Sequence, residues 1–331
     1  MPENILITGG AGYIGSHVNL ELHRRGYKTI IIDNLSSGHA ELVPHGTLVI
    51  TDIGDQAGLR DVFKAYDIDA VMHFAAHAYV GESVQNPAKY YANNVINTLR
   101  LLGIMKEFNV DKIIFSSTCA IYGIPEEIPI SESCPTHPVS PYGRTKLMVE
   151  QILKDYSVAH GLNYVSLRYF NAAGADENYR IGEWHVPETH LIPRLLESAS
   201  NPDFVVELFG TDYDTFDGTC VRDYIHVSDL ADAHIIALTY LLQGGISDCF
   251  NLGNGNGFSV KEIVNAASDV TGIKLKITEA VRRDGDPAIL VGNTDKIREK
   301  LGWQPKFTDI DEIIRTAWQW HRYKNKQYGA D

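Results

Sequence analysis

The sequence of 331 residues is 44% hydrophobic and 21% charged, which is ordinary for a folded globular protein and long enough for a large domain with a smaller lobe. Its net charge of −13 argues against nucleic acid as a partner, because phosphate backbones are bound by basic surfaces. No apolar run reaches the roughly 18 residues that a membrane span needs, and no signal-peptide pattern precedes residues 5–7. The four cysteines lack C-x-x-C spacing, so we expect a cytoplasmic protein without a membrane partner.

Short runs of β-branched residues alternate with longer helical patterns through the first half of the chain. Strands are expected over residues 4–8, 28–33, 47–51, 69–73, 111–116 and 163–169, and helices over 13–25, 56–65, 86–108 and 142–159. This alternation predicts parallel βαβ units. Because the strands are almost wholly apolar, helices should cover both faces of the sheet. Residues 1–171 are therefore predicted to form a Rossmann-type α/β domain with a doubly wound parallel sheet.

The pattern changes after residue 171. Residues 172–188 are polar and loop-like, and residues 201–221 are rich in Asp, Gly and Thr. Residues 222–252 again resemble strand and helix, so we expect this stretch to return to the first domain. Residues 172–331 otherwise mix short helices and strands, which predicts a smaller C-terminal lobe of mixed α/β structure that binds substrate.

A glycine-rich turn, TGGAGYIG (8–15), follows the first predicted strand and opens a helix. Glycines at positions 9, 12 and 15 permit a tight turn, close approach of the backbone to a pyrophosphate, and close packing of the helix on the strand. The amide groups at the positive end of that helix would bind the pyrophosphate. The turn therefore predicts a dinucleotide site.

Asp33 ends the second predicted strand, 18 residues beyond Gly15. A carboxylate at this position accepts hydrogen bonds from the adenosine ribose and repels a 2′-phosphate, which favours NAD over NADP. The alternative is an aspartate that only caps a turn. Asp52, at the end of the third strand, is a candidate contact for the adenine.

Tyr142 and Lys146 begin a strongly helical stretch and share one helix face, because they are four residues apart. A nearby ammonium and a positively charged nicotinamide would favour the phenolate and lower the pKa of Tyr142. The alternative is an ordinary surface pair. Thr118 follows the fifth predicted strand, at the edge where such sheets bind ligands. Its hydroxyl would share a proton with Tyr142, or would only cap the next turn.

These features together resemble the extended short-chain dehydrogenase/reductase family, and the similarity to its UDP-glucose 4-epimerases covers nearly the whole chain. The segments that carry it are TGGAGYIGSH (8–17), HFAAHAYVGES (73–83), YYANNV (90–95), FSSTCAIYG (115–123), PYGRTK (141–146), LRYFNAAGA (167–175), HLIP (190–193), DGTCVRDYIHVSDLADAH (217–234) and RRDGDPA (282–288).

The resemblance implies roles for three groups of residues. The catalytic residues would be Thr118, Tyr142 and Lys146. NAD would be bound by Gly9, Gly12, Tyr13, Ile14, Gly15, Asp33, Asn34, Asp52, Ile53, Phe74, Asn93, Tyr142, Lys146 and Tyr169. The UDP-sugar would be bound by Thr118, Tyr142, Asn171, Leu191, Phe209, Arg222, Arg283 and Asp286.

The resemblance also implies a reaction and an assembly. Tyr142 would remove the proton of the sugar 4-hydroxyl, and hydride would pass from C4 to NAD and return to the opposite face of a transient 4-keto sugar. UDP-glucose and UDP-galactose would thus be interconverted with NAD retained. In relatives the helices over 86–108 and 142–159 pair across a two-fold axis, so a homodimer is expected. Packing within one chain accounts for much of the same apolar pattern: Leu99, Leu102, Leu147, Met148 and Ile152.

Other functions fit parts of the pattern. A 4,6-dehydratase or nucleotide-sugar decarboxylase would carry acidic residues directly after Thr118, where this chain has Cys119 and Ala120. A non-catalytic NAD-binding regulator would be expected to lack one of the catalytic residues. Ala78, where some epimerases carry Lys, and Leu290, near the sugar 2-substituent, leave UDP-N-acetylhexosamines and UDP-xylose or UDP-arabinose open as substrates.

Four residues of types that bind metals lie close together in sequence: Glu183, His185, Glu188 and His190. They lack the helical H-E-x-x-H spacing of a zinc protease and fall in an expected loop. The sequence therefore predicts no metal site.

Overall fold

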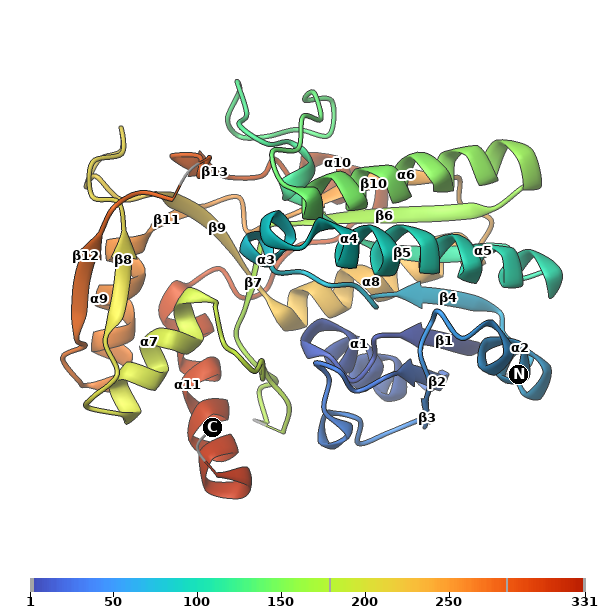
Figure 1. Ribbon diagram of the computed structural model, residues 1–331, viewed down its shortest axis with the longest axis horizontal. Coiled ribbons are helices and arrows are strands. Elements are labelled where there is room, and N and C mark those ends of the chain that lie inside the picture. Colours follow the sequence, from blue (N-terminus) through green and yellow to red (C-terminus); the bar gives the residue numbers. More distant parts are fainter. Residues whose placement is uncertain (1–2, 179, 284, 330–331) are drawn as a thin grey trace.

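The computed structural model describes residues 3–178, 180–283 and 285–329, which form a large α/β part and a smaller part beside it (Figure 1). The large part contains a seven-stranded sheet in the order β10-β6-β5-β4-β1-β2-β3. All neighbouring strands in it are parallel. Its strands are β1 (Asn4–Thr8), β2 (Lys28–Asp33), β3 (Thr47–Ile50), β4 (Ala70–His73), β5 (Lys112–Thr118), β6 (Asn163–Tyr169) and β10 (Asp248–Leu252). The predicted Rossmann-type parallel sheet is confirmed.

Helices cover both faces of this sheet, as the apolar strands require. One face packs against α2 (Gln56–Ala65), α5 (Thr98–Glu107) and α6 (Pro141–His160). The other packs against α1 (Tyr13–Arg24), α8 (Val227–Leu242) and α10 (Asp295–Leu301). The chain runs from β1 outward through β2 and β3, and then from β4 outward through β5 and β6. The carboxyl ends of β1 and β4 therefore flank the switch point at which open α/β sheets bind ligands.

The helix expected over 86–108 is one helical run with an irregular middle. It consists of α4 (Pro87–Tyr90), a π-helix η2 (Tyr91–Asn97) and α5. The amide of Asn94, inside the π-helix, bonds the backbone of His77 and the hydroxyl of Thr145. These are tertiary contacts that helical periodicity does not encode. At β5 the strand continues to Thr118, beyond the predicted end at 116.

The smaller part contains two short sheets packed against three helices. In one sheet β9 (Val221–His226) pairs with β7 (Asn171–Ala173), β11 (Gly257–Ser259) and β13 (Ile289–Leu290), and in the other β8 (Val206–Phe209) pairs with β12 (Ile277–Ala280). The helices are α7 (Leu191–Ser200), α9 (Val260–Thr271) and α11 (Ile310–Tyr328), which share one apolar core. Short helical segments elsewhere are η1 (Ala40–Leu42), α3 (Val80–Gln85) and η3 (Cys119–Ile121).

The stretch 222–252, expected to return to the first domain, is divided between the two parts. Helix α8 packs on α1, and β10 forms the edge of the seven-stranded sheet. Strand β9 instead holds the second sheet together. Among the helices that the structure describes, none is long and apolar enough to cross a bilayer.

A buried ion pair joins α6 to the sheet. Arg168 of β6 donates to Glu150 of α6 through Nη2 at 2.6 Å and Nε at 3.0 Å. The hydroxyl of Ser117 in β5 donates to the same carboxylate at 2.5 Å, and Arg168 also donates to the hydroxyl of Tyr122 at 2.8 Å. Both partners of the ion pair are less than a tenth exposed. The negative charge of Glu150 is thus balanced by Arg168 of β6, and its carboxylate also accepts a hydrogen bond from Ser117 of β5.

We expect Arg168→Met to lower the free energy of unfolding by about 3–5 kcal/mol, because it leaves Glu150 buried without its cation. Arg60→Met is the matched control: the Arg60–Glu107 pair is exposed, and its loss should cost about 1 kcal/mol or less. Urea denaturation measures both. Equal losses in the two variants would contradict a central role for the buried pair.

Candidate active site

The glycine turn between β1 and α1 is a place of close backbone packing. Gly9 has φ +71°, and a Cβ there would lie 2.5 Å from the amide nitrogen of Ala75. A Cβ on Gly15 would lie 2.4 Å from the carbonyl oxygen of Gly9, whereas one on Gly12 would meet only that same oxygen at 3.4 Å. Gly12 is the N-cap of α1 and supplies no side-chain cap. The first amides of α1 are therefore available to an anion.

Asp33 lies at the end of β2 and holds the glycine turn. Its carboxylate accepts hydrogen bonds from the backbone amides of Ala11 and Leu35, both at 2.9 Å. Burial raises its pKa, and these two amides oppose the rise. Asn34 donates a hydrogen bond to Asp52 at 2.6 Å, and the residue after Asp52, Ile53, is buried. The structure thus places the predicted adenosine-binding residues at the carboxyl ends of β1, β2 and β3.

The remaining predicted NAD contacts come from both sides of the switch point. Phe74 directly follows β4, and its amide bonds the carbonyl of Thr8. Asn93 lies in the π-helix. Tyr13, the first residue of α1, donates to the carbonyl of Gly174 at 2.6 Å and so ties α1 to the segment after β7. Tyr169 is buried at the end of β6, and Ile14 is half-buried in α1.

Thr118, Tyr142 and Lys146 meet at the junction of β5 and α6. Thr118 is the last residue of β5, and its hydroxyl also caps η3 by accepting from the amide of Ala120. Ser140 caps α6 with Pro141 in its first turn, which sets the helix start at the residue before Tyr142. Lys146 donates to the carbonyl of Ser116 at 2.6 Å, and its Nζ lies 6.0 Å from the centre of the Tyr142 ring.

Burial disfavours the charged form of both titratable side chains in this set, the phenol of Tyr142 and the amine of Lys146. The residue Tyr142 is partly exposed, but burial around its hydroxyl raises its pKa to about 12, against a hydrogen bond with Thr118 that lowers it. Burial lowers the pKa of Lys146 to about 7, and the Glu150 carboxylate opposes this. The direction for Tyr142 in the protein by itself is opposite to the one argued for a tyrosine beside an ammonium and a nicotinamide, because desolvation is the largest influence on its hydroxyl.

Glu150 is a positioning residue that sequence reasoning missed. It lies one helical turn after Lys146 and holds Ser117 and Arg168 as described above. An acid four residues after the predicted lysine is the only sequence signal, and acids are common at such spacing on exposed helices. Only the buried environment distinguishes this one.

The predicted UDP-binding residues gather in the smaller part. Arg222 pairs with Asp286 at 2.5 Å, and the guanidinium of Arg283 lies 4.0 Å from the centre of the Phe209 ring. Leu191 begins α7 and Asn171 begins β7, and both are half-buried. The structure therefore brings four of these residues together as two pairs, Arg222 with Asp286 and Arg283 with Phe209. The charge of Arg222 is matched by the carboxylate of Asp286.

A glycine turn with an acid at the end of β2, beside a Thr–Tyr–Lys set, defines a dinucleotide-binding enzyme of the short-chain dehydrogenase type. A model of the NAD dependent epimerase/dehydratase family matches residues 5–253, and the chain belongs to that family.

Individual relatives match over almost the full length. The UDP-glucose 4-epimerase of Rhizobium meliloti (strain 1021) is 52% identical over 324 residues, which are 98% of each chain. The structure of UDP-glucose 4-epimerase from Brucella ovis in complex with NAD is 48% identical, with a TM-score of 0.94 and 99% of each chain covered. The UDP-Glc/GlcNAc 4-epimerase from Campylobacter jejuni is 42% identical, with a TM-score of 0.85, covering 97% of this chain and 99% of that one.

Two glycine substitutions separate cofactor binding from folding. Gly12→Ala adds a methyl group at the helix start with room in the protein. We therefore expect a folded protein whose affinity for NAD is at least about tenfold lower, equivalent to about 1.4 kcal/mol, and which retains less NAD. Gly15→Ala forces the methyl group into backbone and should lower the melting temperature as well. NAD released on denaturation and circular dichroism measure the two effects. Full NAD content in Gly12→Ala would contradict this assignment of the turn.

Proposed function

We propose that this protein interconverts UDP-glucose and UDP-galactose by inverting the sugar at C4, with NAD held in the large part of the molecule. The observation that carries the proposal is the meeting of Thr118, Tyr142 and Lys146 at the end of β5. This is the edge at which a parallel α/β sheet binds ligands, in a chain of the NAD-dependent epimerase family.

The residues of the large part fit NAD. The close backbone packing at Gly9 and Gly15 and the uncapped start of α1 suit a pyrophosphate. Asp33 offers a carboxylate to ribose hydroxyls at the end of β2, which disfavours a 2′-phosphate. When bound, NAD supplies reversible hydride acceptance. As the resemblance implies, we assign one further set of residues to contacts with NAD, without dividing it between the adenosine and the nicotinamide: Asn34, Asp52, Ile53, Phe74, Asn93 and Tyr169.

Tyr142 takes the proton from the sugar 4-hydroxyl at its phenolic oxygen and returns it after inversion. With a pKa of about 12, the hydroxyl is protonated at neutral pH in the protein by itself. A positive charge brought close to the ring lowers that pKa; an oxidised nicotinamide carries one, and so does Lys146 in its protonated form. Thr118, hydrogen-bonded to Tyr142, orients the hydroxyl and relays the proton.

The smaller part supplies groups that suit a uridine diphosphate. Arg222 and Arg283 bring guanidinium groups for the phosphates, and Phe209 brings an aromatic ring for the base. Asp286, now paired with Arg222, suits ribose hydroxyls. Asn171 and Leu191 lie at the starts of the neighbouring elements β7 and α7. Binding would exchange the Arg222–Asp286 pair for contacts with the diphosphate and the ribose.

Cys119 argues against a dehydratase. The resemblance implies that a dehydratase would carry the acid or base for eliminating water directly after Thr118. Burial raises the pKa of the Cys119 thiol to about 12, so the thiol stays neutral and transfers no proton near neutral pH. The position after it is Ala120, which has no titratable group.

The first test follows UDP-galactose by proton NMR with purified protein and no added cofactor. We expect UDP-glucose to accumulate to a fixed ratio, and Tyr142→Phe to lower kcat by about 100-fold or more because the proton acceptor is lost. Tyr323→Phe, at an exposed tyrosine, is the matched control and should retain full activity.

Two outcomes would correct this proposal. Unchanged activity in Tyr142→Phe would remove the assigned base. Turnover of UDP-N-acetylgalactosamine but not of UDP-galactose would move the substrate to the N-acetylated sugars. Leu290 is the residue to examine in that case, because it and Cys119 both pack against one small apolar cluster around Ile121.

We also propose a homodimer formed through α5 and α6. Leu99 of α5 and Met148 of α6 are 37% and 39% exposed, and Ile96, three residues before Leu99, is 48% exposed. Leu102, in contrast, belongs to the core of the single chain. An apolar strip along two neighbouring helices suits a two-fold, self-complementary contact. The cytoplasm is the location we propose for this assembly.

Multi-angle light scattering should give twice the chain mass of 36.8 kDa. Leu99→Glu with Met148→Glu should yield monomers, because the charges would be buried at the contact. Ile246→Glu, on an exposed loop, should leave the dimer intact. A wild-type monomer at micromolar concentration would exclude the assembly.

A further inference from the structure

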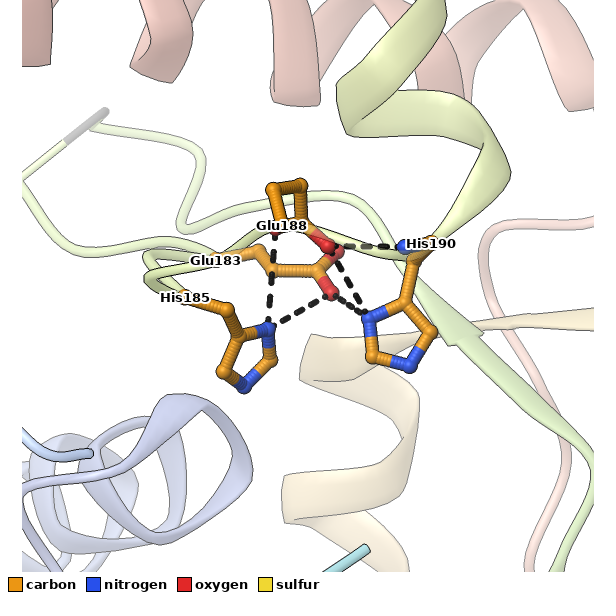
Figure 2. Close-up of side chains that lie close together, drawn as sticks. All are labelled: Glu183, His185, Glu188 and His190. Carbon is orange, nitrogen blue, oxygen red and sulfur yellow. Dashed lines mark hydrogen bonds and ion pairs between the residues drawn. The ribbon is translucent and has the colours of Figure 1, made fainter. Parts of the chain in front are cut away.

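The loop that leads into α7 brings four side chains to one point, as Figure 2 shows. Glu183, His185, Glu188 and His190 each offer one ligand atom, and the four atoms all lie within 4.8 Å of one another. The Nδ1 atoms of His190 and His185 lie 2.6 and 3.2 Å from the same Oε1 of Glu183, and 3.3 and 3.6 Å from the oxygens of Glu188. Ligands of a tetrahedral ion with bonds of about 2.1 Å lie about 3.4 Å apart.

The cluster is rich in negative charge and poor in permanent positive charge. The Glu183 side chain is 8% exposed and that of Glu188 is 22% exposed. In the part of the chain that the structure describes, both carboxylates are paired with histidines and not with lysine or arginine. Two carboxylates this close are costly to bury together unless a cation compensates them.

Two further features of the cluster suit a bound ion. Nδ1 of His185 is buried and, within the described residues, has no aligned hydrogen-bond partner, although the carboxylate of Glu183 is within ion-pair distance. Glu188 Oε1 accepts from the backbone amides of Thr189 and His190 at 2.7 and 2.8 Å. Such outer hydrogen bonds fix the direction of a ligating carboxylate.

The competing occupant of this cluster is a pair of protons. Protonated, His185 and His190 would each form ion pairs with Glu183 and Glu188 over N–O distances of 2.6 to 3.6 Å. A divalent cation would supply the same charge as two such protons. It would also bind all four ligand atoms directly, whereas a protonated His185 meets the same two carboxylates at 3.2 and 3.6 Å.

We propose that Glu183, His185, Glu188 and His190 bind a divalent cation of the Zn²⁺ type. Two imidazoles with two carboxylates suit Zn²⁺, whereas Mg²⁺ and Ca²⁺ prefer sites of oxygen alone. Four protein ligands make a closed site, so the ion is structural and takes no part in the sugar chemistry. Its binding displaces the protons of the two histidines.

The ion would fasten a loop that touches both parts of the molecule. The ring of His185 lies 6.4 Å from that of Tyr13 at the start of α1, and 6.0 Å from that of Tyr79 in the loop after β4. One residue beyond His190, Leu191 begins α7. The expectation of no metal rested on the lack of helical spacing, and this loop brings the ligands together without a helix.

The test is zinc content. Full-length protein is stripped with a chelator and dialysed against Zn²⁺ in the presence of excess Mg²⁺, and bound zinc is measured by mass spectrometry. We expect wild type and His137→Ala, at an exposed histidine, to bind one Zn²⁺ per chain more than the double variant His185→Ala, His190→Ala. Glu183→Gln should weaken binding at least tenfold. Equal zinc in wild type and the double variant, or none in wild type, would leave only a cluster of ion pairs.

A second measurement does not depend on the variants folding. Co²⁺ added to the stripped wild-type protein should give the intense visible absorption of a tetrahedral site, and Zn²⁺ should abolish it. Zn²⁺ should also raise the melting temperature of wild type, since it binds only the folded chain. Absence of both effects would overturn the proposal. None of these readings uses epimerisation, so the proposed activity can stand or fall separately.

Discussion

The bidentate pair between Glu150 and Arg168 fixes α6 against β5 and β6. Because Glu150 lies one turn beyond Lys146, the same contact sets how far Tyr142 and Lys146 stand from Thr118 at the end of β5. The pair is buried, so it is rigid, and its geometry admits few alternatives. The candidate active-site groups are thus carried by a helix and a strand that this contact joins, and not by loops.

Burial has a second consequence at the same place. Desolvation moves the pKa of Tyr142 up and that of Lys146 down, so that the charged forms of both are disfavoured in the protein by itself. A cationic cofactor ring stacked near them would then have a large influence on the phenol, because charges interact strongly where water is excluded. This arrangement would couple the proton transfer to the oxidation state of the cofactor.

Paired charges lie at both of the places where a ligand of the smaller part or its flanking loop is proposed to bind. Arg222 and Asp286 neutralise each other where the diphosphate is proposed to bind, and the loop of His185 and Glu183 holds a second set of compensated charges. Pairing of this kind keeps buried ions tolerable without a ligand. It also means that binding exchanges one set of ion pairs for another, which confers selectivity more than raw affinity.

The sequence alone determined the sheet, the glycine turn and the membership of Thr118, Tyr142 and Lys146 in one site. Strand and helix periodicity, glycine spacing and strand ends are local properties, so they can be read along the chain. Tertiary structure decided the π-helix around Asn94, the role of Glu150, the division of 222–252 between two sheets and the convergence of Glu183, His185, Glu188 and His190. Each of these depends on which distant groups share a buried space, and burial sets both the cost of a charge and the partner that it requires.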